Sequence, residues 1–137
     1  MRLALFLVSL FLAVPAAAAR QQLDTLSPAE AISRAAAASP KPVRAVFQLK
    51  VASAARARRG YYLNSEENFR SAGNLGIVIR TSAMRGLTQK YGRDLKAALA
   101  GKTIKVIGQV RRLAVARGKA TATQVEVTHA GQILSVS

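Results

Sequence analysis

Residues 101–111 read GKTIKVIGQVR, and apolar and polar side chains alternate along them. Ile104, Val106 and Val110 fall on one side of an extended backbone, whereas Lys105 and Arg111 fall on the other. A period of two over this length is typical of a strand with one face buried and the other in water. The stretch therefore predicts a half-buried strand whose outer face is basic.

One glycine precedes this strand, and another interrupts its apolar face. Gly101 stands where a preceding helix would end, because glycine commonly follows the last helical turn. Gly108 falls on the apolar side, where a missing side chain indicates a bulge or a bend of the sheet. A helix that leads into a bent strand of this kind predicts a small β-barrel.

The rest of the chain supplies further elements in a definite order. Alternation predicts strands at 43–52, 61–64, 75–80 and 121–128, and a short edge strand at 132–136. Helical spacing predicts helical segments at 82–91 and 94–100, before the strand described above. This order predicts a mainly β domain with one or two helices. The order of the elements predicts a five-stranded Greek-key OB-fold barrel over residues 43–137, with a helix between strands 3 and 4.

Two connections carry polar side chains. The segment 54–60 contains three arginines and is predicted to join the first two strands. The segment 65–74 is predicted to be a polar loop in which Phe69 is the buried anchor.

The first residues have the composition of a signal peptide. Arg2 precedes an apolar run at 3–14, and Pro15 is followed by four alanines. We expect residues 1–19 to be a signal peptide, cleaved near Ala19, and the protein to be periplasmic or secreted. A retained membrane anchor is the alternative, although the run is shorter than the ~20 apolar residues that a span needs.

Residues 20–42 are predicted to be a short helix or a linker before the domain. Ser27 can cap a helix, Pro28 suits its first position, and Glu30 can complete a capping box. The helix would end near Ala38. Because it has few large apolar residues to bury, it is expected to be weakly docked or to act as a linker.

The charge of the chain is strongly positive. It contains 21 Lys and Arg against 6 Asp and Glu, a formal net charge of +15, and no cysteine. Such a balance favours an anionic partner: nucleic acid, an anionic membrane surface or an acidic polysaccharide. The alternative is that the charge only keeps the protein soluble or reflects an arginine-rich proteome. Without disulfides, the domain must be held together by core burial.

Three segments together resemble a known family. They are YLNSEENFR (62–70) leading to NLGIVI (74–79), LAGKTIKVIGQV (99–110) and VEVTHAGQI (125–133). They resemble a small bacterial exported OB-fold module of the nucleic-acid-binding type, which is found alone or C-terminal to secreted thermonuclease-like domains. The resemblance covers residues 43–136 and implies a barrel that binds nucleic acid. The family usually has Pro-Glu or Pro-Ser where this chain has Ala130-Gly131.

The titratable residues argue against an enzyme. The acids are scattered, and only Glu66 and Glu67 are adjacent, where a solvated loop is the simpler interpretation. His129 is the one histidine, and a metal site needs further ligands. We therefore predict no catalytic residues, no metal and no cofactor.

Basic side chains gather at positions where a barrel could bind an anionic polymer. Arg44 and Lys50 are predicted on the outer face of the first strand. Single-stranded nucleic acid binders combine a basic groove with aromatic side chains on which bases stack. Tyr61 or Tyr62 can supply such a ring, since one of them must face outward, although a tyrosine on a sheet surface is also common. The predicted contacts are Arg56, Arg58, Arg59, Tyr61, Lys105, Arg111, Arg117 and Lys119.

The predicted partner is single-stranded DNA or RNA, bound with little sequence preference because aromatic residues are few. The alternative is a periplasmic or envelope adapter or scaffold that binds a protein partner or an anionic surface, since one fold hosts many functions. A basic groove would favour nucleic acid, whereas evenly spread charge would favour the adapter.

Overall fold

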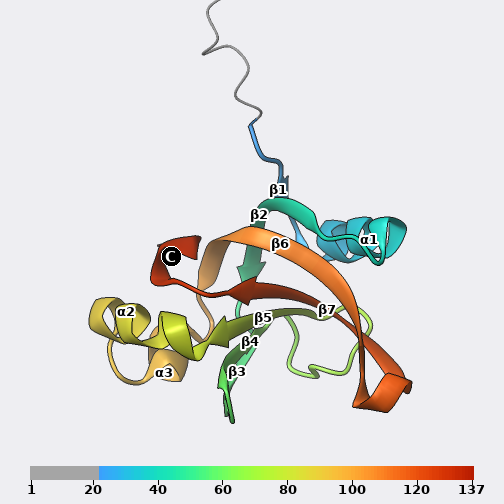
Figure 1. Cartoon of the computed structure of the whole chain (residues 1–137). Helices are drawn as coiled ribbons and strands as arrows, with labels where there is room; N and C mark the ends of the chain where they lie inside the picture. The colour runs from blue at the N-terminus through green and yellow to red at the C-terminus, as the bar shows by residue number, and fades with distance from the viewer. Residues whose placement is uncertain (1–21) are drawn as a thin grey trace, which may run out of the picture.

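The structure is a computed structural model that describes residues 22–137. These residues form eight β-strands and three α-helices, with two short 3-10 turns (Figure 1). In chain order they are β1 (Thr25–Leu26), α1 (Pro28–Ala38), β2 (Val43–Lys50), β3 (Ser53–Ala57), β4 (Gly60–Asn64), β5 (Leu75–Arg80), α2 (Thr81–Tyr91), α3 (Leu95–Leu99), β6 (Thr103–Val115), η2 (Ala116–Gly118), β7 (Ala120–Val127), η3 (Ala130–Gln132) and β8 (Ile133–Val136). The predicted signal peptide and its cleavage site lie outside the described residues.

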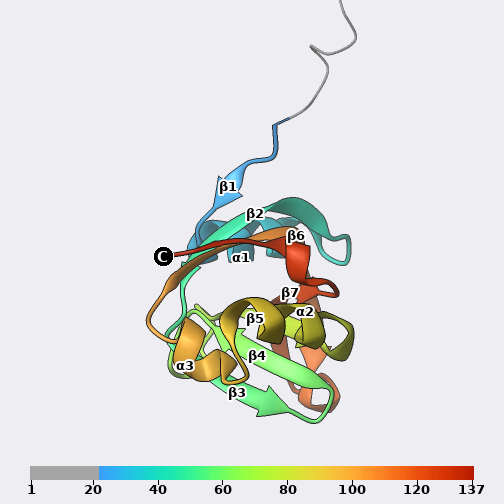
Figure 2. The ribbon, with the colours of Figure 1, turned by 90° about the vertical axis from the view of Figure 1, so that its left-hand side faces the viewer.

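The strands form one mixed sheet that curls strongly. Its order is β1-β2-β6-β7-β5-β4-β3, and β8 pairs with β6 beside this path. The β1–β2 and β5–β7 pairs are parallel, and the others are antiparallel. In Figure 2 the β2 and β6 strands lie above β5, β4 and β3. The sheet therefore has an inner face that encloses the core and an outer face toward solvent.

The predicted five-stranded OB-fold barrel is wrong, because residues 22–137 form an eight-stranded mixed sheet with three α-helices. The mainly β content is confirmed. The segment 54–60, predicted as a connection, is largely strand β3, which pairs with β4, whereas β2 pairs with β6. Strands β1 and β8 also belong to the sheet, at positions where a five-stranded barrel has no strand.

The helix expected after Ser27 is present and docks on the sheet. The Ser27 hydroxyl accepts a hydrogen bond from the Glu30 N–H at 3.3 Å, and the Glu30 carboxylate accepts one from the Ser27 N–H at 3.2 Å. These two bonds lower the pKa of Glu30, the one from the Ser27 backbone more than the one from its hydroxyl. Ala31 and Ala35 are fully buried and belong to the same core as Phe47. Small side chains on this face let α1 lie close to the strands beneath it.

The predicted alternation of residues 101–111 is confirmed. Ile104, Val106 and Val110 are fully buried, while Lys105 and Arg111 are exposed on the outer face. Within residues 22–137, no helix combines the length and the apolar character that a bilayer span requires. The side chains that remain available to a partner are those of the outer face, of the turns and of the exposed sides of the helices.

Candidate functional site

A groove of about 620 Å³ crosses the outer face of β2, β6, β7 and β5. Strand pairing places its side chains together, since residues directly opposite each other in a sheet point to the same side. Arg111 lies opposite Gln124 in the β6–β7 pair, and Arg44 lies opposite Gln109 in the β2–β6 pair. The three cationic residues that line this outer-face groove are Arg44, Arg80 and Arg111.

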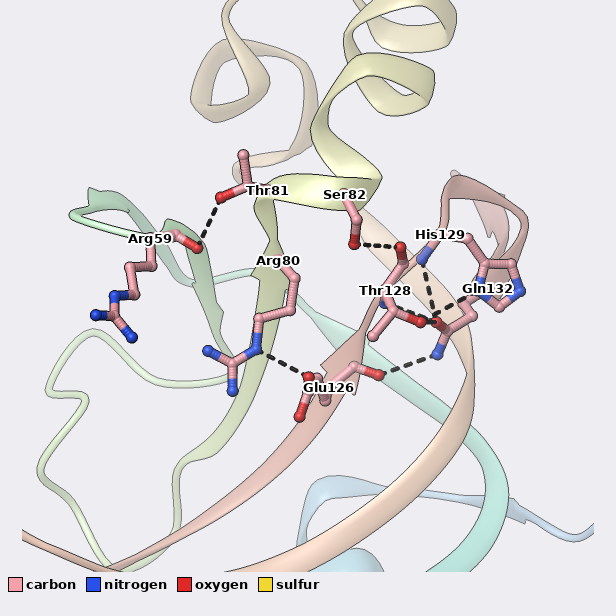
Figure 3. Close-up of polar contacts among 8 residues, drawn as sticks. All are labelled: Arg59, Arg80, Thr81, Ser82, Glu126, Thr128, His129 and Gln132. Carbon is pink, nitrogen blue, oxygen red and sulfur yellow. Dashed lines mark hydrogen bonds and ion pairs between the residues drawn. The ribbon is translucent and has the colours of Figure 1, made fainter.

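One acidic side chain partly neutralises the groove. The Arg80 Nε donates to the Glu126 carboxylate at 2.9 Å (Figure 3). This hydrogen bond, together with the charge of Glu126, raises the pKa of Arg80. Both side chains are about half exposed, so the pair adds at most about 1 kcal/mol to stability. Within residues 22–137 the other ion pair joins Arg34 to Asp24, so neither Arg44 nor Arg111 forms an ion pair with an acid of the described chain.

A buried amide holds one wall of the groove in place. Gln132 donates through its Nε2 to the carbonyl oxygens of Ile107 and Glu126, at 3.0 Å each. Its Oε1 accepts from the Thr128 N–H at 2.8 Å (Figure 3). Ile107 lies where β6 exchanges one neighbour, β7, for another, β8, so its carbonyl has no strand partner on that side. A side chain at Gly108 would come within 3.1 Å of the same amide, which explains the glycine at this position. The β2–β6 register is regular through Gly108, and the register shift of β6 lies between Lys105 and Val106.

We expect Gln132→Ala to lower the free energy of unfolding by about 2–3 kcal/mol, because two carbonyls and a backbone N–H lose the buried amide that is their partner. Urea unfolding followed by circular dichroism measures this change. Gln109→Ala is the matched control, since Gln109 is exposed in the same groove. Equal unfolding midpoints for the two variants would contradict the assigned role of Gln132.

Basic turns lie at the two ends of the outer face. Arg58 and Arg59 form the β3–β4 turn, and the Arg59 carbonyl accepts a hydrogen bond from the Thr81 hydroxyl at 3.2 Å (Figure 3). Arg117 and Lys119 lie in the β6–β7 turn at the opposite end. Strand β7 runs from the β6–β7 turn to the level of the β3–β4 turn, and its eight residues are about 25 Å long. The groove lies between them.

Three of the predicted contact residues lie elsewhere. Tyr61 is only 7% exposed and packs in the core, opposite Ile79, so its ring cannot stack on a ligand. Arg56 lies opposite Tyr61 and lines a separate hollow with Met84 of α2, a hollow that Arg58 of the β3–β4 turn also lines. Lys105 is on the outer face of β6 but beside β8, about 20 Å along the strand from Arg111.

The structure thus unites Arg111 with residues that the sequence did not select. Alternation predicts an outward Arg44, but neither Arg44 nor Arg80 is among the predicted contacts. Arg80 directly follows the inward Ile79, so alternation along the strand predicts that its side chain points outward. Tyr62 is the half-buried member of the tyrosine pair and lies opposite Val78, which lines the groove.

The described residues contain no group of three or more His, Cys, Asp or Glu side chains that could hold a metal ion. Four of the six acids instead have local structural partners. Asp24 pairs with Arg34, Glu30 caps α1, Asp94 caps α3 and Glu126 pairs with Arg80.

No protein-family model matches the chain. No curated protein matches it either. Among solved structures, the chain is similar to a protein from Leishmania major Friedlin assigned as an aspartyl-tRNA synthetase, with a TM-score of 0.50 and 9% sequence identity. The match covers 85% of this chain but 22% of that one, so the chain spans about a fifth of its length. At this identity the likeness shows a shared fold.

Proposed function

We propose that this chain is an exported, non-catalytic protein that binds the sugar-phosphate backbone of single-stranded nucleic acid in the outer-face groove. The observation that carries the proposal is the row of cations formed by Arg44 and Arg111 between two basic turns. A phosphate backbone presents negative charge at regular intervals, and a row of arginines matches it.

The size of the groove favours a single strand. Its volume of about 620 Å³ is that of a site for a drug-sized ligand, which corresponds to one or two nucleotides rather than to a duplex. The length of β7, about 25 Å, would accommodate at most about seven phosphates at the spacing of a B-form strand. The strand would thus run from one turn to the other and place its central phosphates in the groove.

Two further observations support the proposal. The similar solved structure is named as an aspartyl-tRNA synthetase, and a tRNA is a polynucleotide. The shared fold therefore supports a polynucleotide as the partner of this chain. The structural roles of Asp24, Glu30, Asp94 and Glu126 support a binding function without catalysis. The predicted signal peptide supports export to the periplasm or beyond.

A salt titration tests the proposal. Fluorescence anisotropy would follow a labelled oligodeoxythymidine binding to the protein, beside labelled heparin of similar charge. We expect tighter binding of the oligonucleotide and a log–log salt slope of about −3, since four or five phosphate contacts each contribute about −0.7. Equal affinity for heparin, or no binding near physiological salt, would contradict the proposal and favour the adapter.

A further inference from the structure

One large apolar side chain lies on the surface where a buried one was predicted. Phe69, in the loop between β4 and β5, is 60% exposed, and the prediction that it anchors this loop is wrong. The Arg70 guanidinium lies over its ring, 5.1 Å from the centroid. A cation at this position covers one face of the ring and leaves ring surface open to solvent.

Buried polar side chains anchor the loop instead. Asn74 is buried, and its Nδ2 donates to the Asn64 Oδ1 at 3.1 Å and to the Phe69 carbonyl at 3.2 Å. Its Oδ1 accepts from the Glu66 N–H at 3.1 Å. The Ser65 hydroxyl accepts from the Leu75 N–H at 2.8 Å. The bond from Asn74 holds the Phe69 carbonyl directly and the others hold the two ends of the loop, so the exposed ring is presented by an ordered loop.

Strand pairing places Asn64, which precedes the loop, beside β5, a strand that lines the groove. Asn64 is opposite Gly76 in the β4–β5 pair, and Gly76 is beside Gln124 in the β5–β7 pair. Gln124 in turn is opposite Arg111 and lines the groove. The space above Gly76 is bounded by the Asn64 Oδ1 and the Gln124 side chain. Figure 1 shows the loop following β4, on the side of the sheet where β7 begins.

We infer that Phe69 is the base-stacking residue of this site, and that it holds one unpaired base of a strand whose phosphates contact Arg111. The inference rests on the proposed function. Single-strand binders combine a basic groove with an aromatic face, and every base offers a π-surface to such a ring. The ordered loop lowers the entropy cost of stacking, because the ring is already positioned.

The test compares variants of Phe69 in the full protein. We expect Phe69→Ala to weaken binding of an oligodeoxythymidine about tenfold without changing the salt slope, because stacking neutralises no phosphate. Phe69→Tyr should keep the affinity, whereas Phe69→Leu, which is apolar but not aromatic, should lose it. Heparin has no bases, so its binding should be the same for all variants. Leu134→Ala, which removes another exposed apolar side chain, is the matched control.

A spectroscopic signal makes the test specific. The chain has no tryptophan, so Phe69→Trp introduces a single tryptophan, whose emission is distinct from that of the three tyrosines. We expect its emission to be quenched by the oligonucleotide and unchanged by heparin.

The outcomes separate the two proposals. Wild-type binding that depends on salt, with unchanged affinity for Phe69→Ala and no quenching, would overturn the stacking role and leave the proposed function in place. An equal loss of heparin affinity in Phe69→Ala would also overturn stacking, since heparin has no base. No preference of the wild type for the oligonucleotide would overturn both.

Discussion

Gly60→Ala is expected to lower the free energy of unfolding by at least about 4 kcal/mol, enough to leave little folded protein. Gly60 follows the basic β3–β4 turn and has a φ of +146°. A Cβ there would overlap the carbonyl oxygen of Ile79 and lie 3.0 Å from its carbonyl carbon. Both are backbone atoms of β5, so the clash cannot be relieved without opening the β4–β5 pair.

Urea unfolding followed by circular dichroism tests this prediction, with Gly92→Ala as the matched control. Gly92 also has a positive φ, +102°, but no atom lies within 4 Å of the added Cβ. The control should lose only about 1–2 kcal/mol, which is the cost of the backbone conformation. If Gly60→Ala remains soluble and as stable as the control, the close pairing of β4 with β5 at this turn is contradicted.

Arg44→Gln combined with Arg111→Gln is expected to produce the largest loss of binding. Each arginine that contacts a phosphate contributes about 0.7 to the log–log salt slope for a single strand. The double variant should therefore reduce the magnitude of the slope by about 1.4. Its affinity for oligodeoxythymidine should fall about 25-fold in about 0.1 M salt and about fivefold in about 0.3 M salt. Anisotropy titrations at several salt concentrations measure both quantities.

A second double variant separates the groove from net charge. Arg93→Gln with Lys96→Gln removes the same charge from the α2–α3 region, and neither residue lines the groove. We expect a small loss of affinity and no change in slope, since these cations only add to the overall field of the protein. Equal slopes for the two double variants would show that binding follows total charge, and the groove would not be the site. Unfolding midpoints close to that of the wild type would confirm that all four exposed positions tolerate glutamine.

Local patterns predicted the elements of this chain well, because each depends on neighbouring residues. Strand β5 begins and ends where alternation placed it, and the capping box of Ser27 and Glu30 is formed. The faces of β6 follow directly from its period of two. Such signals are present in any short stretch of the chain, so no knowledge of the partner strands is needed.

The first predicted strand and the connection predicted after it show what local patterns cannot predict, namely which strands pair. Residues 43–57 are all compatible with extended backbone. No local sequence feature indicates that β2 and β3 pair with different strands. The two tyrosines show the same limit. Alternation requires that one of them faces inward, but only the pairing of Tyr61 with Ile79 decides which one. The apolar character of Phe69 predicts that it is buried. The buried Asn64 and Asn74 anchor the loop instead, through the hydrogen bond between their side chains.

The sequence by itself determined the positive charge, the capped helix and the alternating faces of the strands, since these follow from composition and residue spacing. Only the tertiary structure decided which outward side chains share a groove. Arg44, Arg80 and Arg111 come from three strands and meet because β2 and β7 pair with β6, and β5 pairs with β7. Strand pairing is a contact between distant segments, and its register is set by packing of the whole core rather than by any one stretch.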